Sequence, residues 1–424
     1  MTNVRKLALE AIYKIMAEKA YANLTVNRYL NRYKLEANDR RLFTKLVYGT
    51  VENIIKLEYL LRPFVKKEPE ARIKYLLYLS LYQIEYTDIP PFAAVDEAVK
   101  IAKEKNRFAA SFVNAVLRNY LRGGKRDLSN LPKNEYLSVE YSHPLWLVDF
   151  FLDVYGYETT EKILKENNAS RPLSVRVNTL KTTLGDVEAE LRKDGIGFDR
   201  IPIVSSGLSV IGDLHGHRLL REGKLVFQDG AAQLVAEMMA PDKNAKIIDL
   251  CAGPGGKTAH LSALMNNGGL IYACDIHRHK IELMDKLFYR LGVRNVKTAL
   301  ADARKIGEIL DEKDFDYVLA DVPCSGLGAL SDRIDLKYRI NRESIAELID
   351  LQREILDKTW SLVKPGGKYV YSTCTINPEE NEAQIAAFLE RTPFARVIAE
   401  RMILPFEYRT DGFYICIMEK RVEN

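Results

Sequence analysis

The sequence lacks several features that mark secreted, membrane and fibrous proteins. Five cysteines among 424 residues are too sparse for a disulfide framework. No run approaches the roughly 20 apolar residues of a membrane-spanning helix, and the N-terminal stretch has no apolar segment typical of a signal peptide. These absences predict a cytoplasmic protein with free thiols.

The composition predicts a well-cored globular protein rather than a disordered or collagen-like one. Hydrophobic residues make up 47% of the chain and charged residues 28%. At roughly 150 residues per domain, the length predicts two or three domains.

Charge is unevenly distributed along the chain. Residues 1–145 hold 25 Lys and Arg against 16 Asp and Glu, a net charge of 25 − 16 = +9, and the remainder holds 37 against 42, or −5. A basic domain joined to an acidic one suits a protein that binds an anionic polymer with one domain and modifies it with the other. The alternative is that the basic surface is only a solvated face.

Residues 1–145 have the pattern of a helical domain. Apolar side chains at Val4, Leu7, Ala8 and Ile12 fall on one side of a helix. Similar stripes recur up to Gly123, and the segments between them are separated by Pro63, Pro69, Pro90–Pro91 and Gly123–Gly124. We expect six or seven helices here.

The rest of the chain divides into two further patterns. Residues 146–235 alternate in polarity around Leu173–Val177, which predicts a small α+β domain. Residues 236–424 repeat strand, turn and helix, which predicts a doubly wound, Rossmann-like α/β domain. Its expected parallel strands are Ile247–Leu250, Leu270–Cys274, Val296–Leu300, Tyr317–Ala320 and Lys368–Tyr371, followed by an antiparallel pair at Ala395–Val397 and Phe413–Met418.

A glycine-rich turn follows the first of these strands. The residues are Cys251, Ala252, Gly253, Pro254, Gly255, Gly256 and Lys257, preceded by Asp249. Neither the phosphate-binding spacing Gly-x4-Gly-Lys-Ser/Thr nor the dinucleotide spacing Gly-x-Gly-x-x-Gly is present. The turn instead suits a cofactor without a pyrophosphate, such as S-adenosylmethionine.

Acidic residues stand at four successive strand ends, where such folds bind ligands. Asp249 lies at the end of the first strand, Asp275 follows the second, Asp302 follows the third and Asp321 ends the fourth. We expect Asp275 to accept from ribose hydroxyls and Asp302 from an adenine amino group. The alternative for each is a helix cap, but four in register favour a cofactor site.

Two cysteines lie at the ends of strands expected to be neighbours. Cys324 follows Asp321-Val322-Pro323 and Cys374 follows Thr373, so the two thiols can meet in space. A thiolate that adds to C6 of a pyrimidine makes C5 nucleophilic enough to accept a methyl group. Asp321 could stabilise charge near ring N3, and the second thiol could serve elimination. This chemistry requires one nucleophile but does not say which cysteine it is.

A metal site is not expected. No Cys-x2-Cys spacing occurs, and the histidines form only two short pairs, His215 with His217 and His277 with His279. Cys251, Cys274 and Cys416 are expected to be small buried hydrophobes.

These motifs carry a family resemblance. Residues 171–424 resemble the RNA cytosine-C5 methyltransferases of the Nol1/Nop2/Sun family, through Arg171–Thr179, Gln228–Ala232, the Cys251–Thr258 loop, Asp321–Cys324 and Thr373–Cys374. The first part resembles the antitermination factor NusB, through Asp39–Phe43, Gly49–Thr50, Tyr82–Ile84, Asp96–Val99 and Phe112–Arg118. The combination is similar to bacterial methyltransferases of small-subunit ribosomal RNA.

The resemblance implies roles for particular residues. It implies Cys374 as nucleophile, Cys324 as the thiol for product release and Asp321 as a contact to ring N3. It further implies an S-adenosylmethionine site made of Cys251–Lys257, Asp275, Asp302 and Asp321. The middle domain resembles an RNA-recognition-like segment, in which Arg176 and Asn178 either touch RNA or are structural.

The resemblance implies a cytosine of 16S rRNA as the substrate. One alternative keeps the chemistry and changes the substrate to tRNA. The other is a non-catalytic RNA-binding or assembly protein, against which stand both cysteines, Asp321 and the intact glycine loop. We expect the chain to act as a monomer, without a metal and away from membranes.

Overall fold

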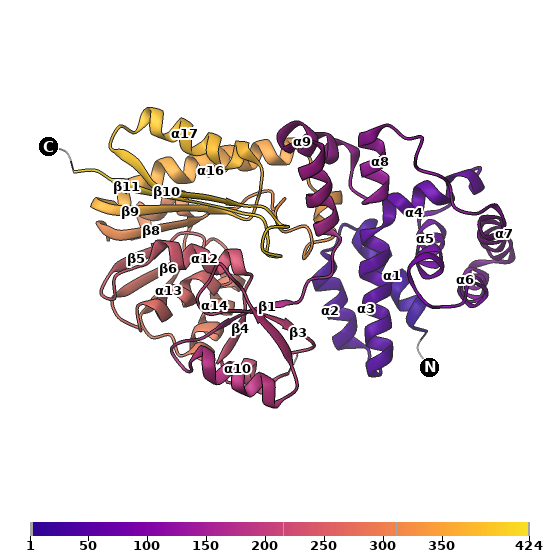
Figure 1. The fold of residues 1–424 in the computed structure, drawn as a ribbon, viewed down its shortest axis with the longest axis horizontal. Helices are drawn as coiled ribbons and strands as arrows, with labels where there is room; N and C mark the ends of the chain where they lie inside the picture. The colour runs from indigo at the N-terminus through magenta and orange to yellow at the C-terminus, as the bar shows by residue number, and fades with distance from the viewer. Residues whose placement is uncertain (1–2, 215, 311, 423–424) are drawn as a thin grey trace. The chain divides into compact units, whose positions relative to one another are not determined.

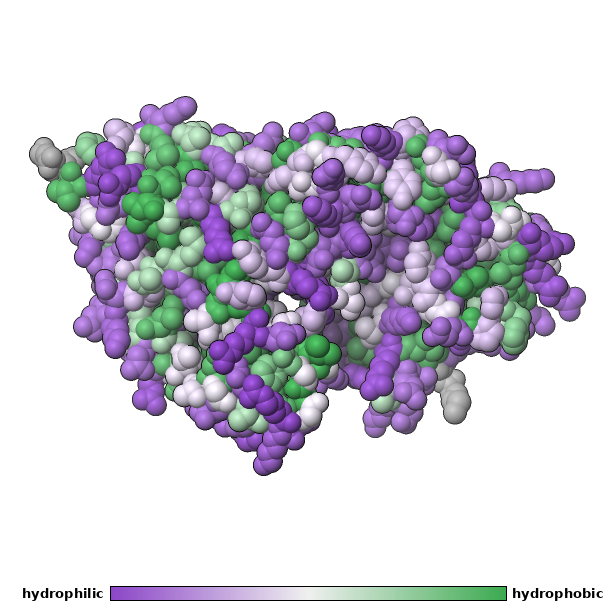
Figure 2. Space-filling view, viewed as in Figure 1, coloured by the Kyte–Doolittle hydropathy of each residue, from purple (hydrophilic) through white to green (hydrophobic). Residues whose placement is uncertain are grey.

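The chain forms two compact units in a computed structural model that describes residues 3–214, 216–310 and 312–422 (Figure 1). The first comprises Met1–Ala169 with Leu330–Arg339, and the second comprises Ser170–Ala329 with Ile340–Asn424. Among the described residues, no helix is long and apolar enough to cross a membrane. On the face drawn in Figure 2, hydrophilic side chains are interspersed with small hydrophobic patches.

The first unit is helical, as the sequence predicts, although the described part of residues 1–145 holds eight α-helices rather than six or seven. In α1 the side chains of Leu7, Ile12 and Ile15 are buried on one stripe, and the side chain of Asn3 accepts from the first backbone N–H groups. Pro91 begins one helix and Gly124, at φ 76°, follows the end of another. The helices of residues 1–169 are α1 Val4–Met16, α2 Ala22–Arg32, α3 Ala37–Glu52, α4 Ile54–Leu61, η1 Arg62–Phe64, α5 Ala71–Tyr86, α6 Pro91–Lys105, α7 Arg107–Gly123, α8 Lys133–Glu140 and α9 Leu145–Asn167.

Helix α9 belongs to this first compact unit, whose first segment ends at Ala169. Polar contacts join the C-terminal end of α9 to the turn that precedes the helix. Asn168 Nδ2 donates to the Tyr141 carbonyl at 2.7 Å, and the Tyr141 hydroxyl donates to Glu161 at 3.1 Å. The Asn167 amide lies 3.3 Å from the ring of His143, a fully buried residue.

The second unit starts with a small antiparallel sheet. Its strands follow the order β2-β3-β1-β4, and Val175, Val177, Leu208 and Val210 form its core. This confirms the predicted α+β segment. The elements are β1 Leu173–Val177, α10 Leu184–Lys193, β2 Gly197–Arg200, β3 Gly207–Ile211, α11 Arg218–Arg221 and β4 Leu225–Phe227.

A seven-stranded sheet of order β10-β11-β9-β8-β5-β6-β7 forms the rest of this unit. Strands β5 to β9 pair in parallel, and β10 and β11 are antiparallel, as the sequence predicts. The elements are α12 Gly230–Met239, β5 Lys246–Asp249, α13 Gly256–Leu264, β6 Leu270–Asp275, α14 Arg278–Leu291, β7 Val296–Leu300, η2 Ala303–Lys305, α15 Ile306–Ile309, β8 Phe315–Asp321, α16 Arg342–Thr359, η4 Trp360–Leu362, β9 Val363–Thr373, η5 Pro378–Glu380, α17 Glu382–Arg391, β10 Ala395–Ile403 and β11 Phe413–Lys420.

Helices cover both faces of this sheet because successive side chains of a buried strand point to opposite faces. Ile248 and Val318 pack in one cluster with Leu356 of α16. Their neighbours Ile247 and Leu319 pack in another cluster, with side chains of α12 and α13. Figure 1 shows α16 and α17 on one side of the sheet and α12, α13 and α14 on the other.

The segment Leu330–Arg339 leaves the second unit and completes the first. Ile334 is buried in the core of the helical unit, and Lys337, only 2% exposed in the turn η3 (Leu336–Tyr338), donates to the Glu52 carbonyl at 2.9 Å. Burial lowers the pKa of Lys337 to about 7, against the opposing effect of Glu52. Burial likewise raises the pKa of Glu52 to about 7. The positive charge of Lys337 and the negative charge of Glu52 thus each reduce the cost of burying the other group.

We predict that Lys337→Met lowers the free energy of unfolding by about 3 kcal/mol, because it leaves the Glu52 carboxyl buried without a cation. Burial raises the pKa of Glu52 in the folded state, and removal of Lys337 takes away the charge that lowers it. The variant therefore keeps most stability at acidic pH and loses it as pH rises above the ordinary carboxyl pKa, through about 7 and beyond. Urea unfolding across this pH range measures the effect.

Two further variants control this experiment. Lys125→Met removes an ion-pairing lysine that is 69% exposed, and should cost less than about 1 kcal/mol. Adding Glu52→Gln to Lys337→Met should restore stability and flatten its pH dependence. A Lys337→Met loss no larger than that of Lys125→Met would contradict the proposed charge compensation.

Candidate functional site

The candidate site lies at the carboxyl edge of the seven-stranded sheet. Because β5, β6, β8 and β9 are parallel, the residues that end them meet at the same edge. Asp249 ends β5, Asp275 ends β6 and Asp321 ends β8. Cys374 directly follows β9. The structure therefore gathers the predicted acids and the predicted thiols on one edge.

The glycine loop between β5 and α13 packs its backbone closely against the next strand end. Ala252 N–H donates to the Cys274 carbonyl at 2.8 Å, and Gly253 N–H donates to Asp275 Oδ2 at 3.1 Å. A Cβ on Gly253 would lie 2.6 Å from that same oxygen. Gly255 has φ 103°, a conformation that favours glycine. The loop is thus a tight turn in which side chains at these two positions do not fit.

Asp249 and Asp275 hold this loop. The Thr258 hydroxyl donates to Asp249 Oδ2 at 2.7 Å, and burial raises the pKa of Asp249 to about 7. The Oδ1 atom of Asp249 is buried without a partner among the described residues. Asp275, only 3% exposed, accepts from His277 N–H at 2.9 Å and from Lys280 Nζ at 3.2 Å.

Asp302 and Asp321 have different partners. Asp302 caps η2 by accepting from Arg304 N–H at 2.9 Å, and its carboxylate also pairs with the Arg304 guanidinium at 2.7 Å. These bonds lower the pKa of Asp302. The capping alternative is therefore realised at Asp302. Asp321 accepts from Lys257 Nζ at 2.8 Å and from the Ser372 hydroxyl at 2.9 Å.

The two thiols predicted to meet do so. Cys324 Sγ and Cys374 Sγ lie 3.5 Å apart. The hydrogen bond with Cys374, together with burial, raises the pKa of Cys324 well above its ordinary value. Although burial opposes it, the charge of Asp321 keeps the pKa of Lys257 raised, with a smaller contribution from Cys374. Lys257 is therefore a protonated amine whose positive charge interacts with the Cys374 sulfur.

Cys274 and Cys416 belong to the core, as expected, whereas Cys251 is only partly buried. Cys274 and Cys416 are fully buried in one hydrophobic cluster, and Cys251 packs against it. Burial raises the pKa of both Cys274 and Cys416 to about 12. Such thiols are inert at neutral pH.

Sequence reasoning missed a polar network behind the two thiols. Its centre is Glu380, which is fully buried and accepts from groups on both thiol-bearing loops. In the sequence, Pro378-Glu379-Glu380-Asn381-Glu382 has the composition of a solvated turn. Only the burial of Glu380 and Asn381, beside the exposed Glu379, reveals that two of these side chains face inward.

Arg176 and Asn178 are structural in this arrangement. They are 0% and 1% exposed, so the alternative in which they touch RNA is wrong for this structure. The Arg176 guanidinium donates to Gln228 at 2.7 Å, and Asn178 Nδ2 donates to the Leu291 carbonyl at 2.8 Å. Asn178 thereby joins the small sheet to the end of α14, whereas Arg176 contacts the residue that directly follows β4.

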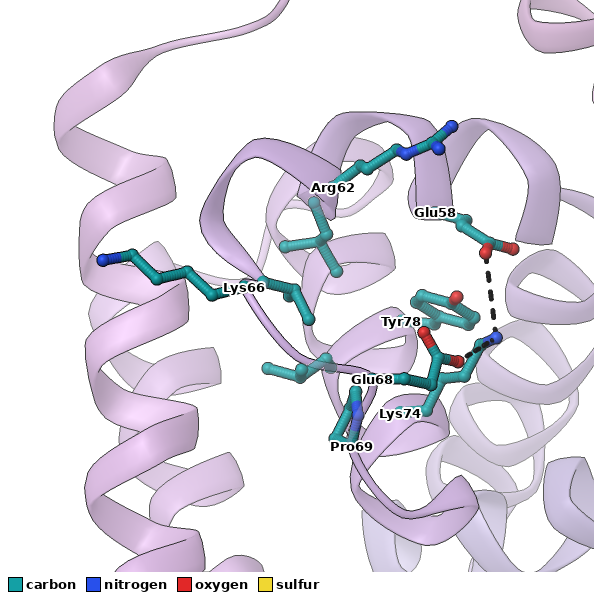
Figure 3. A pocket seen from close by; sticks show the side chains of 10 residues that line it. Glu58, Arg62, Lys66, Glu68, Pro69, Lys74 and Tyr78 are labelled. Carbon is teal, nitrogen blue, oxygen red and sulfur yellow. Dashed lines mark hydrogen bonds and ion pairs between the residues drawn. The ribbon is translucent and has the colours of Figure 1, made fainter.

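Two other features of the described residues lie apart from this edge. No group of three or more metal-ligating side chains occurs in the described part of the chain, and His215 lies outside it. In the helical unit, a cavity of about 390 Å³ is lined by Arg62, Lys66 and Tyr78, among others (Figure 3). Lys74 pairs there with Glu68 at 2.6 Å and Glu58 at 3.7 Å. The residues that line this cavity include charged side chains but no cysteine, serine, threonine or histidine.

Comparison with known proteins agrees with the geometry. Residues 236–419 match the family of the 16S rRNA methyltransferase RsmB/F, residues 143–214 match the ferredoxin-like domain of RsmF/B-like methyltransferases, and residues 2–122 match the NusB family.

Relatives cover the chain from end to end. The "Probable ribosomal RNA small subunit methyltransferase B" of Bacillus subtilis is 36% identical over 99% of both chains. The ribosomal RNA small subunit methyltransferase B of Vibrio cholerae is 32% identical over 99% of this chain and 98% of its own. The crystal structure of PH0851 superposes with a TM-score of 0.85 at 27% identity, covering 99% of each chain. The chain therefore belongs to the RsmB/F family of 16S rRNA methyltransferases, which depend on S-adenosylmethionine.

Proposed function

We propose that this enzyme methylates C5 of one cytosine in small-subunit ribosomal RNA through a covalent bond between Cys374 and ring C6. The observation that carries the proposal is the pair of thiols 3.5 Å apart at the sheet edge. A methyltransferase that modifies an oxygen or an exocyclic nitrogen needs no thiol nucleophile. Carbon C5 does need one, because it becomes nucleophilic only after addition at C6.

The substrate class rests on the relatives and on charge. The curated relatives are named for small-subunit ribosomal RNA. The excess of nine positive charges in residues 1–145 suits a polyanion. A tRNA substrate would use the same thiols, so the assay must offer both RNAs.

The first step is addition to the ring. The Cys374 thiolate forms a bond to C6, and the electron pair of the C5–C6 double bond moves toward N3 and the carbonyl. The ammonium group of Lys257 favours the thiolate, since its charge lies in the field of Cys374. Asp321, whose Oδ2 accepts from Lys257 at 2.8 Å, would lie at the N3 edge. In its protonated form it would donate to N3, where negative charge develops during addition.

The remaining steps restore the ring. S-adenosylmethionine supplies the methyl group that C5 takes up. Cys324, in its thiolate form, takes the C5 proton; the electron pair of that C–H bond re-forms the C5–C6 double bond, and the C6–S bond breaks to return the Cys374 thiolate. We assign Cys324 to this release step, because its sulfur lies 3.5 Å from the sulfur that departs.

The residues of the sheet edge fit the methyl donor. Gly253 leaves open a backbone surface beside Asp275, where an added Cβ would collide with the carboxylate. Asp275 has acceptor capacity for ribose hydroxyls. We assign binding to Cys251–Lys257, Asp275, Asp302 and Asp321; Asp302 would act together with its partner Arg304.

The experiment that tests the proposed function offers unmodified 16S rRNA and unmodified tRNA together with methyl-labelled S-adenosylmethionine. We expect label in 16S rRNA, at a single cytosine located by bisulfite sequencing. Label on tRNA alone would overturn the substrate, and label at a position other than C5 would overturn the chemistry.

The roles of the two thiols predict opposite behaviour of their variants. Cys324→Ser should form the bond to RNA and fail to release it, so a covalent protein–RNA band should accumulate on denaturing gels. Cys374→Ser should show neither the band nor methylation. Cys416→Ala, which alters a buried core thiol, is the control and should behave like the wild type. A covalent band in Cys374→Ser would reverse the assignment.

The glycine loop predicts a loss of cofactor affinity in Gly253→Ala. The added methyl group would lie 2.6 Å from Asp275 Oδ2 and 2.5 Å from Lys280 Cδ, so the loop must shift. We expect the Kd for S-adenosylmethionine to rise about tenfold or more, or about 1.4 kcal/mol, in titration calorimetry. Gly307→Ala, whose Cβ would meet no atom within 4 Å, is the matched control and should leave the Kd unchanged.

A further inference from the structure

A buried carboxylate stands between the two loops that carry the thiols. Glu380 is 0% exposed and lies in the short turn η5. Its Oε1 accepts from Ser325 N–H at 2.8 Å. Its Oε2 accepts from the Ser325 hydroxyl and from the Thr375 hydroxyl, the latter at 3.3 Å. Ser325 directly follows Cys324, and Thr375 directly follows Cys374, so one side chain contacts the neighbours of both thiols.

Further bonds fix the Cys324 loop to the same carboxylate. Gln352 Nε2 donates to Glu380 Oε1 at 3.0 Å and to the Pro323 carbonyl at 2.9 Å. The residues on both sides of Cys324 are therefore held through Glu380 or through Gln352. The Ser325 and Thr375 hydroxyls also lie 2.7 Å apart, which links the two loops directly.

The Cys374 loop is fixed by the next residue of the same turn. The Thr373 hydroxyl donates to Asn381 Oδ1 at 2.6 Å, and Asn381 Nδ2 donates to the Thr375 carbonyl at 3.0 Å. Asn377 Nδ2 completes the set by donating to Glu380 Oε2 at 3.1 Å. Every side chain in this network is buried, so water does not compete for these bonds.

We propose that Glu380 is a positioning residue that sets the separation of the Cys324 and Cys374 sulfurs and thereby the rate of the thiol chemistry. This inference rests on the proposed function for its kinetic part only. Glu380 touches no sulfur itself and acts through Ser325 and Thr375. A buried carboxylate accepts from several donors at once, whereas an amide offers one oxygen and brings two hydrogens of its own.

The geometry says what Glu380→Gln would disturb. An amide nitrogen in place of Oε1 would face two donors, Ser325 N–H and Gln352 Nε2. An amide nitrogen in place of Oε2 would face Asn377 Nδ2. In either orientation the amide NH2 group would face another hydrogen-bond donor, so at least one of the two loops must shift. A shift of about 1 Å between reacting groups can lower the rate by about 10²-fold.

The first measurement needs no RNA. Diamide takes two electrons from the two thiols, which lose their protons and form a disulfide, and mass spectrometry follows its appearance. In the wild type the sulfurs start 3.5 Å apart, so the Cys324–Cys374 disulfide should form rapidly. Glu380→Gln should form it at least tenfold more slowly. The matched control is Glu379→Gln, which alters the exposed neighbour in the same turn and should match the wild type.

The second measurement separates positioning from folding. With 16S rRNA as substrate, Glu380→Gln should lower kcat by about 10²-fold, while KM for RNA and Kd for S-adenosylmethionine stay within twofold. A variant damaged in fold would lose cofactor affinity as well. If the wild type methylates neither 16S rRNA nor tRNA, the proposed function fails, whereas the diamide rates still decide the role of Glu380.

If Glu380→Gln forms the disulfide with diamide at the wild-type rate and has the wild-type kcat, the inference is overturned. If Glu380→Gln does not fold, Ser325→Ala and Asn377→Ala each remove one donor and keep the carboxylate. At least one of them must then slow disulfide formation several-fold, and wild-type rates in both would equally overturn it.

Discussion

The parallel pairing of β8 with β9 is the constraint on which the site depends. It places Asp321 opposite Ser372, so the residues that follow both strands leave the sheet at the same level. The two cysteines, 50 residues apart in sequence, thereby come within 3.5 Å. The same alignment of β5 and β6 brings the glycine loop and Asp275 to this edge. A shift of register in either pair of strands would move these groups apart.

The sequence predicts those parts of the molecule whose signal is local. Strand β7 has the predicted bounds Val296–Leu300, because this short segment follows a helix and its terminal Gly292 within a repeating pattern of strand, turn and helix. The meeting of the two thiols also follows from strand ends alone. Glu380 was missed because its partners lie up to 55 residues away, at Ser325, and nothing within its own turn distinguishes it from exposed Glu379.

Burial and hydrogen-bond partners decide the roles of residues for which the sequence allowed two interpretations. Arg176 and Asn178 have side chains suited to RNA, yet both are needed inside to satisfy neighbouring polar groups. The assignment of Asp302 to a cap depended on Arg304, two residues further on. The end of the helical unit depended on bonds from α9 back to Tyr141. In each case the deciding partner was a polar atom, whose pairing leaves no periodic trace in the sequence.

The segment Leu330–Arg339 has a consequence for synthesis on the ribosome. In the helical unit Ile334 fills part of the core and Lys337 donates to the Glu52 carbonyl, yet these residues are made about 170 positions after α9. The first 169 residues therefore emerge with a gap in their core that closes only when most of the catalytic sheet has been translated. Folding of the two units is interleaved in time, and neither can be cut out as one continuous piece of the gene.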